Sequence, residues 1–211
     1  MKEKGKLKYF GHIPSRLDVG MVLTRLGYRK TTTVISEEYR KKIDAMIEEG
    51  LTLCNIQGVY GRYEIKSHEE NGIKIFDDIF LESKSLSKLL ENSMEVVFMA
   101  TTLGSGIIKK IQQEIKNENA DFALILDSLA SQIVDAGLDW MVEFINKEIR
   151  REGKKLTKSR YSPGYGELLL SNQKIIYDIL NLKKLEIKLT EKYMLIPEKS
   201  VIAIAGIEGI E

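Results

Sequence analysis

Two kinds of hydrophobic periodicity in one chain limit what it can fold into. Across Val59–Lys66 apolar and polar residues alternate, which is typical of a β-strand with one exposed face. Asn71-Gly72 then favours a two-residue hairpin turn with positive φ angles, and residues 73–76 supply the returning strand. Residues 121–151, by contrast, carry apolar side chains at helical spacing. A hairpin combined with long helices favours an α+β fold over a repeated βαβ array.

The rest of the chain supplies more elements of both types. Helices are expected over 17–26, with Asp18 near the start, from an N-cap at Ser36, around 86–90 and 107–115, and from an N-cap at Ser171. Buried or alternating strands are expected over 79–81, 95–101, 185–189 and 200–205. The lysine-rich segment 153–158 reads as a mobile loop. We therefore expect a single domain over residues 1–211.

Composition excludes several classes of function. Lys and Arg number 32 against 31 Asp and Glu, so the net charge of +1 provides no field for nucleic-acid binding. One cysteine and two histidines cannot form an internal disulfide or a zinc site, which favours a reducing compartment. The longest apolar runs fall far short of the ~20 residues that span a bilayer. We expect a cytoplasmic protein without a metal, a membrane segment or a nucleic-acid partner.

Two patterns are weaker candidates for a site. Residues 102–107 place glycines between a strand and a helix, but they complete neither a dinucleotide loop nor a P-loop, which favours a simple turn. Asp127, Asp135 and Asp139 recur at helical spacing, as an acidic edge for a cationic ligand or as a solvated face.

The segment Arg160–Gly166 is the most informative part of the sequence. Its arginine has a fork suited to a carboxylate or phosphate, and Gly164 and Gly166 permit positive φ or close approach. Tyr165 offers a flat face between the two glycines, and Gln173 follows nearby. These residues alone are compatible with a clamp for a small ligand or with a tight structural connection.

This segment resembles the Arg-x-x-x-Gly-Tyr motif of the reactivation domain of cobalamin-dependent methionine synthase. Leu189–Pro197 followed by Ser200-Val201 is similar to the Leu-Thr-Glu-Ser…Pro…Ser-Val segment of that domain, and Leu17-Asp18 resembles its early Ile-Asp element. The matches span most of the chain, which therefore resembles a stand-alone form of the domain. The implied fold is a curved, mainly antiparallel sheet with packed helices.

The resemblance also implies a function. The chain would bind S-adenosylmethionine and present its methyl group to cobalamin carried by a partner, supporting the reductive methylation of cob(II)alamin to methylcobalamin. The implied partners are the corrinoid-binding modules of methionine synthase, with a flavodoxin or ferredoxin as electron donor. Such a protein orients its ligand and needs no acid–base pair.

Individual residues carry over from the family motifs. Arg160 matches the arginine that pairs with the methionine carboxylate, and Asp18 matches the aspartate that accepts from the amino group. Gly164, Tyr165 and Gly166 match the turn whose backbone lies along the ligand.

Three further positions follow from the same comparison. Ala205 and Gly206 fall where the last strand contacts the ligand through its main chain. Asp135 matches an acidic helix position if the long helix aligns without a gap. After Gly-Tyr the synthase continues Pro-Ala-Cys-Pro, whereas this chain has Gly166–Leu169, so the contacts on the adenine side differ.

Two other interpretations remain open. One is a docking adaptor for a corrinoid protein that does not bind S-adenosylmethionine. The other is a reactivase for a different corrinoid methyltransferase, with another methyl donor in place of the methionine pathway.

Overall fold

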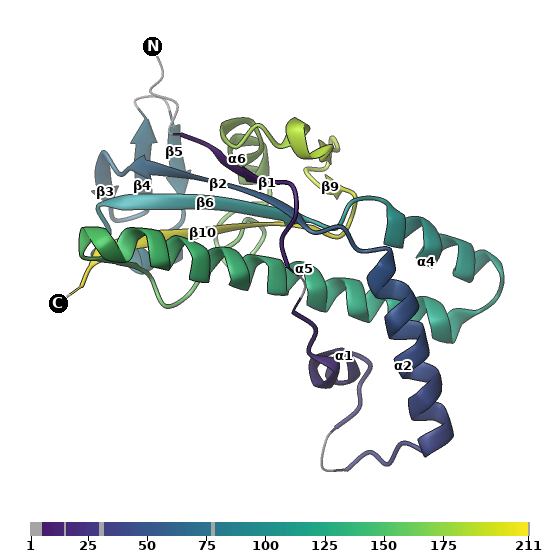
Figure 1. Ribbon diagram of the computed structural model, residues 1–211. Coiled ribbons are helices and arrows are strands. Elements are labelled where there is room, and N and C mark those ends of the chain that lie inside the picture. Colours follow the sequence, from purple (N-terminus) through teal and green to yellow (C-terminus); the bar gives the residue numbers. More distant parts are fainter. Residues whose placement is uncertain (1–5, 15, 30–31, 77–78, 211) are drawn as a thin grey trace.

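An antiparallel sheet of five strands forms the centre of the molecule. The computed structural model describes residues 6–14, 16–29, 32–76 and 79–210. The strands lie in the spatial order β1 (Lys8–Phe10), β2 (Gln57–Glu64), β6 (Glu95–Thr102), β10 (Ser200–Gly209) and β7 (Lys154–Leu156). Every neighbouring pair is antiparallel. The expected curved α+β architecture with packed helices is confirmed (Figure 1).

Helices cover one face of this sheet. The longest, α5 (Ala120–Ile149), runs along the sheet and beyond it, and α1 (Val19–Arg25), α2 (Glu37–Thr52) and α4 (Gly106–Lys116) pack against it (Figure 1). The N-cap expected at Ser36 is formed, because its side chain accepts from the N–H of Tyr39, and Asp18, expected near the start of its helix, caps α1 by accepting from the N–H of Met21. A 3₁₀ turn, η1 (Arg150–Glu152), follows α5 and leads to β7.

The opposite face carries smaller elements. A second sheet contains β3 (Ser67–Glu69), β4 (Gly72–Phe76) and β5 (Ile79–Glu82), and it is followed by α3 (Lys84–Leu89). After β7 come α6 (Asn172–Ile179), η2 (Leu182–Leu185) and the short pair β8 (Lys188–Leu189) and β9 (Leu195–Ile196). These elements build a second hydrophobic cluster, so the main sheet has a core on each side.

The hairpin expected from Asn71-Gly72 differs from the one that forms. Residues 73–76 pair with β3 and β5, and the N–H of Lys66 also donates to the carbonyl of Lys74 at 2.7 Å, whereas β2 lies in the main sheet between β1 and β6. The two loop residues are Glu70 and Asn71, and the described positive φ angles include neither Asn71 nor Gly72. Gly72 is needed for space, because a Cβ there would lie 2.3 Å from the carbonyl oxygen of Leu81 in β5.

Four other expectations are corrected by the structure. The strand β2 is buried on both faces, since Val59 and Tyr63 enter one core while Tyr60 enters the other beneath α5. The lysine-rich segment contains β7, which pairs with β10. Leu185 belongs to the 3₁₀ turn η2 and not to a strand, and Ser171 makes no side-chain capping bond.

Candidate functional site

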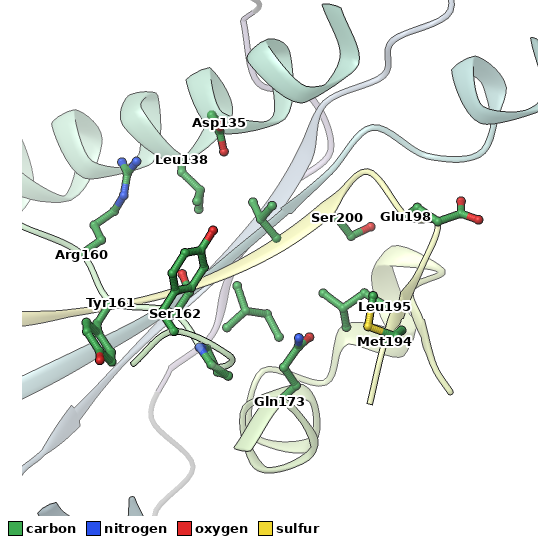
Figure 2. Close-up of a pocket in the computed structure, with 14 residues that line it drawn as sticks. Asp135, Leu138, Arg160, Tyr161, Ser162, Gln173, Met194, Leu195, Glu198 and Ser200 are labelled. Atoms are coloured by element: carbon green, nitrogen blue, oxygen red, sulfur yellow. The ribbon is translucent and has the colours of Figure 1, made fainter. Parts of the chain in front are cut away.

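A cavity of about 540 Å³ opens where β10, α5 and the segment after β7 meet. This volume lies within the range of about 300–1,000 Å³ that is usual for small-molecule sites. The lining residues come from four parts of the chain: Asp135, Leu138, Arg160, Tyr161, Ser162, Pro163, Tyr165, Gln173, Met194, Leu195, Glu198, Ser200, Val201 and Ile202 (Figure 2). The site therefore exists only in the folded chain.

The segment Arg160–Gly166 is held against β10 by its backbone. Tyr161 and Ile204 exchange hydrogen bonds of 2.9 and 2.7 Å, which extend the edge of the sheet past β7. Gly164 and Gly166 have φ angles of 92° and 50°, in the region that favours glycine. The expected positive φ angles are thus confirmed, and they turn the chain so that Tyr165, 70% exposed, stands at the cavity.

Arg160 brings positive charge to the cavity. Its Nη1 donates a 2.6 Å hydrogen bond to Oδ1 of Asp139 on α5, and its side chain is 28% exposed. Among the described residues the other guanidinium N–H groups have no hydrogen-bond partner. A second carboxylate could therefore bind Arg160 without displacing Asp139.

The three aspartates of α5 serve as anchors for other segments. Asp127 pairs with Lys199 at 2.8 Å, Asp135 with Arg25 at 2.5 Å, and Asp139 with Arg160. The helical spacing thus gives a row of ion pairs between α5 and its neighbours. Of the three carboxylates, only Asp135 lines the cavity, where α1 fixes it through Arg25.

The wall of the cavity away from Arg160 and Asp135 is mainly apolar. Met194, Leu195 and Ile202 contribute apolar surface, and Gln173 reaches it from the first turn of α6 (Figure 2). The Gln173 Oε1 atom is buried and accepts no hydrogen bond from the described part of the chain. The cavity therefore combines a charged part with an apolar part that contains one unpartnered carboxamide.

The structure brings together some of the residues singled out from the sequence. Arg160, Tyr165 and Asp135 line one cavity, and Gly164 and Gly166 shape the turn beside it without lining it. Residues 194–195 and 200–201 of the resembling C-terminal segment also line the cavity. The similarity of that segment was the signal by which these residues could have been assigned to the site.

Asp18 lies at another cavity, of about 570 Å³, beside α1 and the start of α2. Its lining residues are Asp18, Gly20, Met21, Leu23, Thr24, Tyr28, Arg29, Thr33, Ile35 and Arg40. The carboxylate of Asp18 caps α1 at 3.1 Å from the N–H of Met21. The structure thus does not bring Asp18 to the cavity of Arg160.

Ala205 and Gly206 also lie outside the Arg160 cavity. Ala205 is fully buried in β10, paired with Val97. The N–H and C=O of Gly206 are bonded to Thr157, at 3.0 and 2.9 Å, and a Cβ at Gly206 would lie 2.0 Å from Ser93 Oγ. In this arrangement the main chain of Gly206 holds the segment after β7.

No group of three His, Cys, Asp or Glu side chains is arranged to hold a metal ion within the ranges described above. No helix in those ranges is both long and apolar enough to cross a membrane.

The fold and the site define an α+β domain with a small-molecule cavity beside an edge of its main antiparallel sheet. Comparison with solved structures finds a likeness to the MetH reactivation domain bound to AdoHcy, with a TM-score of 0.67 and 13% sequence identity. The match covers 97% of this chain and 79% of that one, and it shows that the two share a fold. No family model and no curated protein matches the sequence.

Proposed function

We propose that the chain binds S-adenosylmethionine in the Arg160 cavity and acts as a reactivation subunit for a cobalamin-dependent methionine synthase. One observation supports this proposal above all. The two segments that resemble the reactivation domain, Arg160–Gly166 and the one that ends at Ser200-Val201, meet around a single cavity. The fold of the chain, which is that of a reactivation domain, supports the same function.

The donor set of the cavity suits the methionine part of the ligand. The unpartnered N–H groups of Arg160 can bind the carboxylate, and the carboxylate of Asp135 can balance the ammonium and sulfonium charges nearby. The structural neighbour binds AdoHcy, the product that remains after S-adenosylmethionine loses its methyl group. These features fit a thioether or sulfonium nucleoside with an amino-acid tail.

The chemistry required of this chain is positioning. S-adenosylmethionine supplies the methyl group, a partner carries the cobalamin, and a flavodoxin or ferredoxin supplies the electron that reduces cob(II)alamin before methyl transfer. Arg160 and the turn at Gly164 would hold the ligand so that its methyl group faces the partner. The open mouth beside the exposed Tyr165 leaves room for that approach.

The decisive experiment is a reconstitution. The partner in its cob(II)alamin state is mixed with the reductant, S-adenosylmethionine and this protein, and the visible spectrum is followed for methylcobalamin. Omitting the protein should abolish the conversion, and Arg160→Ala should slow it at subsaturating S-adenosylmethionine. Equal rates with and without the protein would contradict the reactivation function.

One observation favours a second function, that of a docking adaptor. Arg160 is already paired with Asp139, so the guanidinium has a neutralising partner without any ligand. A chain that had ceased to bind S-adenosylmethionine could retain this arrangement. Calorimetric titration separates the two functions, because the adaptor shows no heat of binding that depends on Arg160.

A further inference from the structure

Among the residues that line the cavity, Gln173 has a buried side-chain oxygen that accepts no hydrogen bond from the described part of the chain. Gln173 lies in the first turn of α6, and its side chain makes no hydrogen bond to the described residues. A buried carbonyl oxygen without a donor costs about 1–3 kcal/mol, and such groups are rare in folded proteins. Its presence in a cavity wall indicates a ligand that supplies the missing donor.

Other buried unpartnered atoms in the described residues do not share this position. Ser93 Oγ and Gln132 Oε1 line neither cavity, and the amide nitrogen of Gln132 is already bonded to the carbonyl of Arg16. Gln173 is therefore singled out by the combination of a missing partner and a place in the wall of the Arg160 cavity.

The surroundings of Gln173 suit a flat, weakly polar group. Figure 2 shows its carboxamide pointing from α6 toward the side of the cavity where Met194 and Leu195 lie, with Arg160 across the space. The thioether of Met194 and the aliphatic carbons of Leu195 favour a ring over a charged group. The charged tail of a nucleoside ligand is accommodated at Arg160, which leaves the base for this end.

We propose that the Gln173 carboxamide recognises the 6-amino edge of adenine and determines the base specificity of the cavity. Adenine presents its 6-amino donor beside a ring-nitrogen acceptor, and a glutamine carboxamide presents the matching acceptor and donor. Rotation about the last side-chain bond exchanges Oε1 and Nε2 at low cost, so the oxygen can reach the ligand. This inference rests on the proposed function, because it assigns one end of the same site.

The test uses two adenine-side probes that lack the amino-acid tail. These are 5′-methylthioadenosine and its analogue with hydrogen in place of the 6-amino group, each titrated by calorimetry into the full chain. The wild type should prefer the amino compound by about tenfold, because one hydrogen bond to Oε1 is lost in the analogue. Gln173→Leu and the length-matched Gln173→Met should reduce that preference to about twofold or less.

Control variants separate recognition from folding. Gln113→Leu changes an exposed glutamine on α4 and should keep the full preference. Arg160→Ala should weaken S-adenosylhomocysteine but leave 5′-methylthioadenosine unaffected. If Gln173 only supports the fold, its variants will weaken both adenine-side probes equally and keep the preference, which overturns the proposal.

The result also separates this inference from the proposed function. If S-adenosylhomocysteine binds in an Arg160-dependent way but Gln173 variants keep the preference for the amino group, the function stands and the role of Gln173 is wrong. If neither S-adenosylhomocysteine nor S-adenosylmethionine binds the wild type, both are wrong.

Discussion

Nη1 of Arg160 lies 2.6 Å from Oδ1 of Asp139, so the arginine that the sequence marks for a ligand is already held by the long helix. Asp139 is 63% exposed, whereas the Arg160 side chain is 28% exposed. An ion pair with such an exposed carboxylate contributes only about 0–1 kcal/mol to the free energy of unfolding, but it fixes the orientation of the guanidinium. The pair thus positions Arg160 at the cavity and leaves its other N–H groups available for a ligand carboxylate.

Arg160→Ala should weaken S-adenosylmethionine by about 1.5–3 kcal/mol, because it removes a charge-assisted contact. Arg160→Lys should recover only part of the affinity, since an ammonium cannot make the bidentate contact. Asp139→Asn is the matched control, because it changes the partner of Arg160 and not the arginine itself. It keeps the shape, frees the guanidinium and should leave the affinity equal or increase it. Calorimetry that finds equal affinity for the wild type and Arg160→Ala would exclude a role for this arginine.

Asp18 separates a structural role from a ligand role. Asp18 is the N-cap of α1, so Asp18→Ala should lower the free energy of unfolding by about 1 kcal/mol. Asp18→Asn should have a small effect, because Asn caps equally well. Urea unfolding measures both. If Asp18 also meets the ligand ammonium, as the resemblance implies, Asp18→Asn will weaken S-adenosylmethionine more than an analogue without the amino group. Equal losses would restrict Asp18 to the fold.

Gly72→Ala should destabilise the second sheet. The added Cβ would lie 2.3 Å from the Leu81 carbonyl oxygen, and a backbone atom cannot move aside without breaking the pairing of β4 with β5. We expect a loss of about 1–3 kcal/mol in the free energy of unfolding. Gly209→Ala is the control, because nothing lies within 4 Å of a Cβ at that strand residue. Denaturant unfolding that shows equal effects for both variants would contradict the close approach.

An ion-pair network should make stability depend on pH. Hydrogen bonding to Arg62, at 2.7 Å, lowers the pKa of Glu152 from its ordinary value of 4.5 to about 2. Because the folded state has the lower pKa, the stabilisation is complete above pH 4.5 and is lost as the pH falls toward 2. Glu152→Gln should therefore cost at most about 1 kcal/mol at pH 7.

The pH dependence of that difference is the measurement that matters. Urea unfolding of the wild type and Glu152→Gln should show a gap that narrows as the pH falls below 4.5. Glu91→Gln, an exposed residue without an ion pair among the described residues, should show no such gap. A gap for Glu152→Gln that stays constant from pH 7 to pH 3 would contradict the coupling to Arg62.

The sequence was sufficient for features that depend on neighbouring residues. Helix starts at Asp18 and Ser36 follow from side chains that cap within one turn, and the positive φ angles of Gly164 and Gly166 follow from their lack of a Cβ. The row of aspartates on α5 was also visible, as a helical spacing. Their partners were not, because Lys199, Arg25 and Arg160 come from distant segments.

For the strands, too, the sequence did not reveal partners from distant segments. The alternation along Val59–Lys66 correctly separated the two faces of β2, but only the packing of α5 decided that both are buried. The pairing partner of residues 73–76 likewise depended on tertiary structure, since β6 occupies one edge of β2 and β1 occupies part of the other.

By itself the sequence determined the α+β class, most helices and strands, and the positive φ angles of Gly164 and Gly166, because periodicity, capping and glycine chemistry act within a few residues. Only the tertiary structure decided which of the marked residues share a cavity. It joined Arg160 to Asp135, Gln173 and the start of β10, and it placed Asp18 and Gly206 elsewhere. The physical reason is that a cavity is made by strand order and helix packing between segments far apart in the chain, which local patterns do not encode.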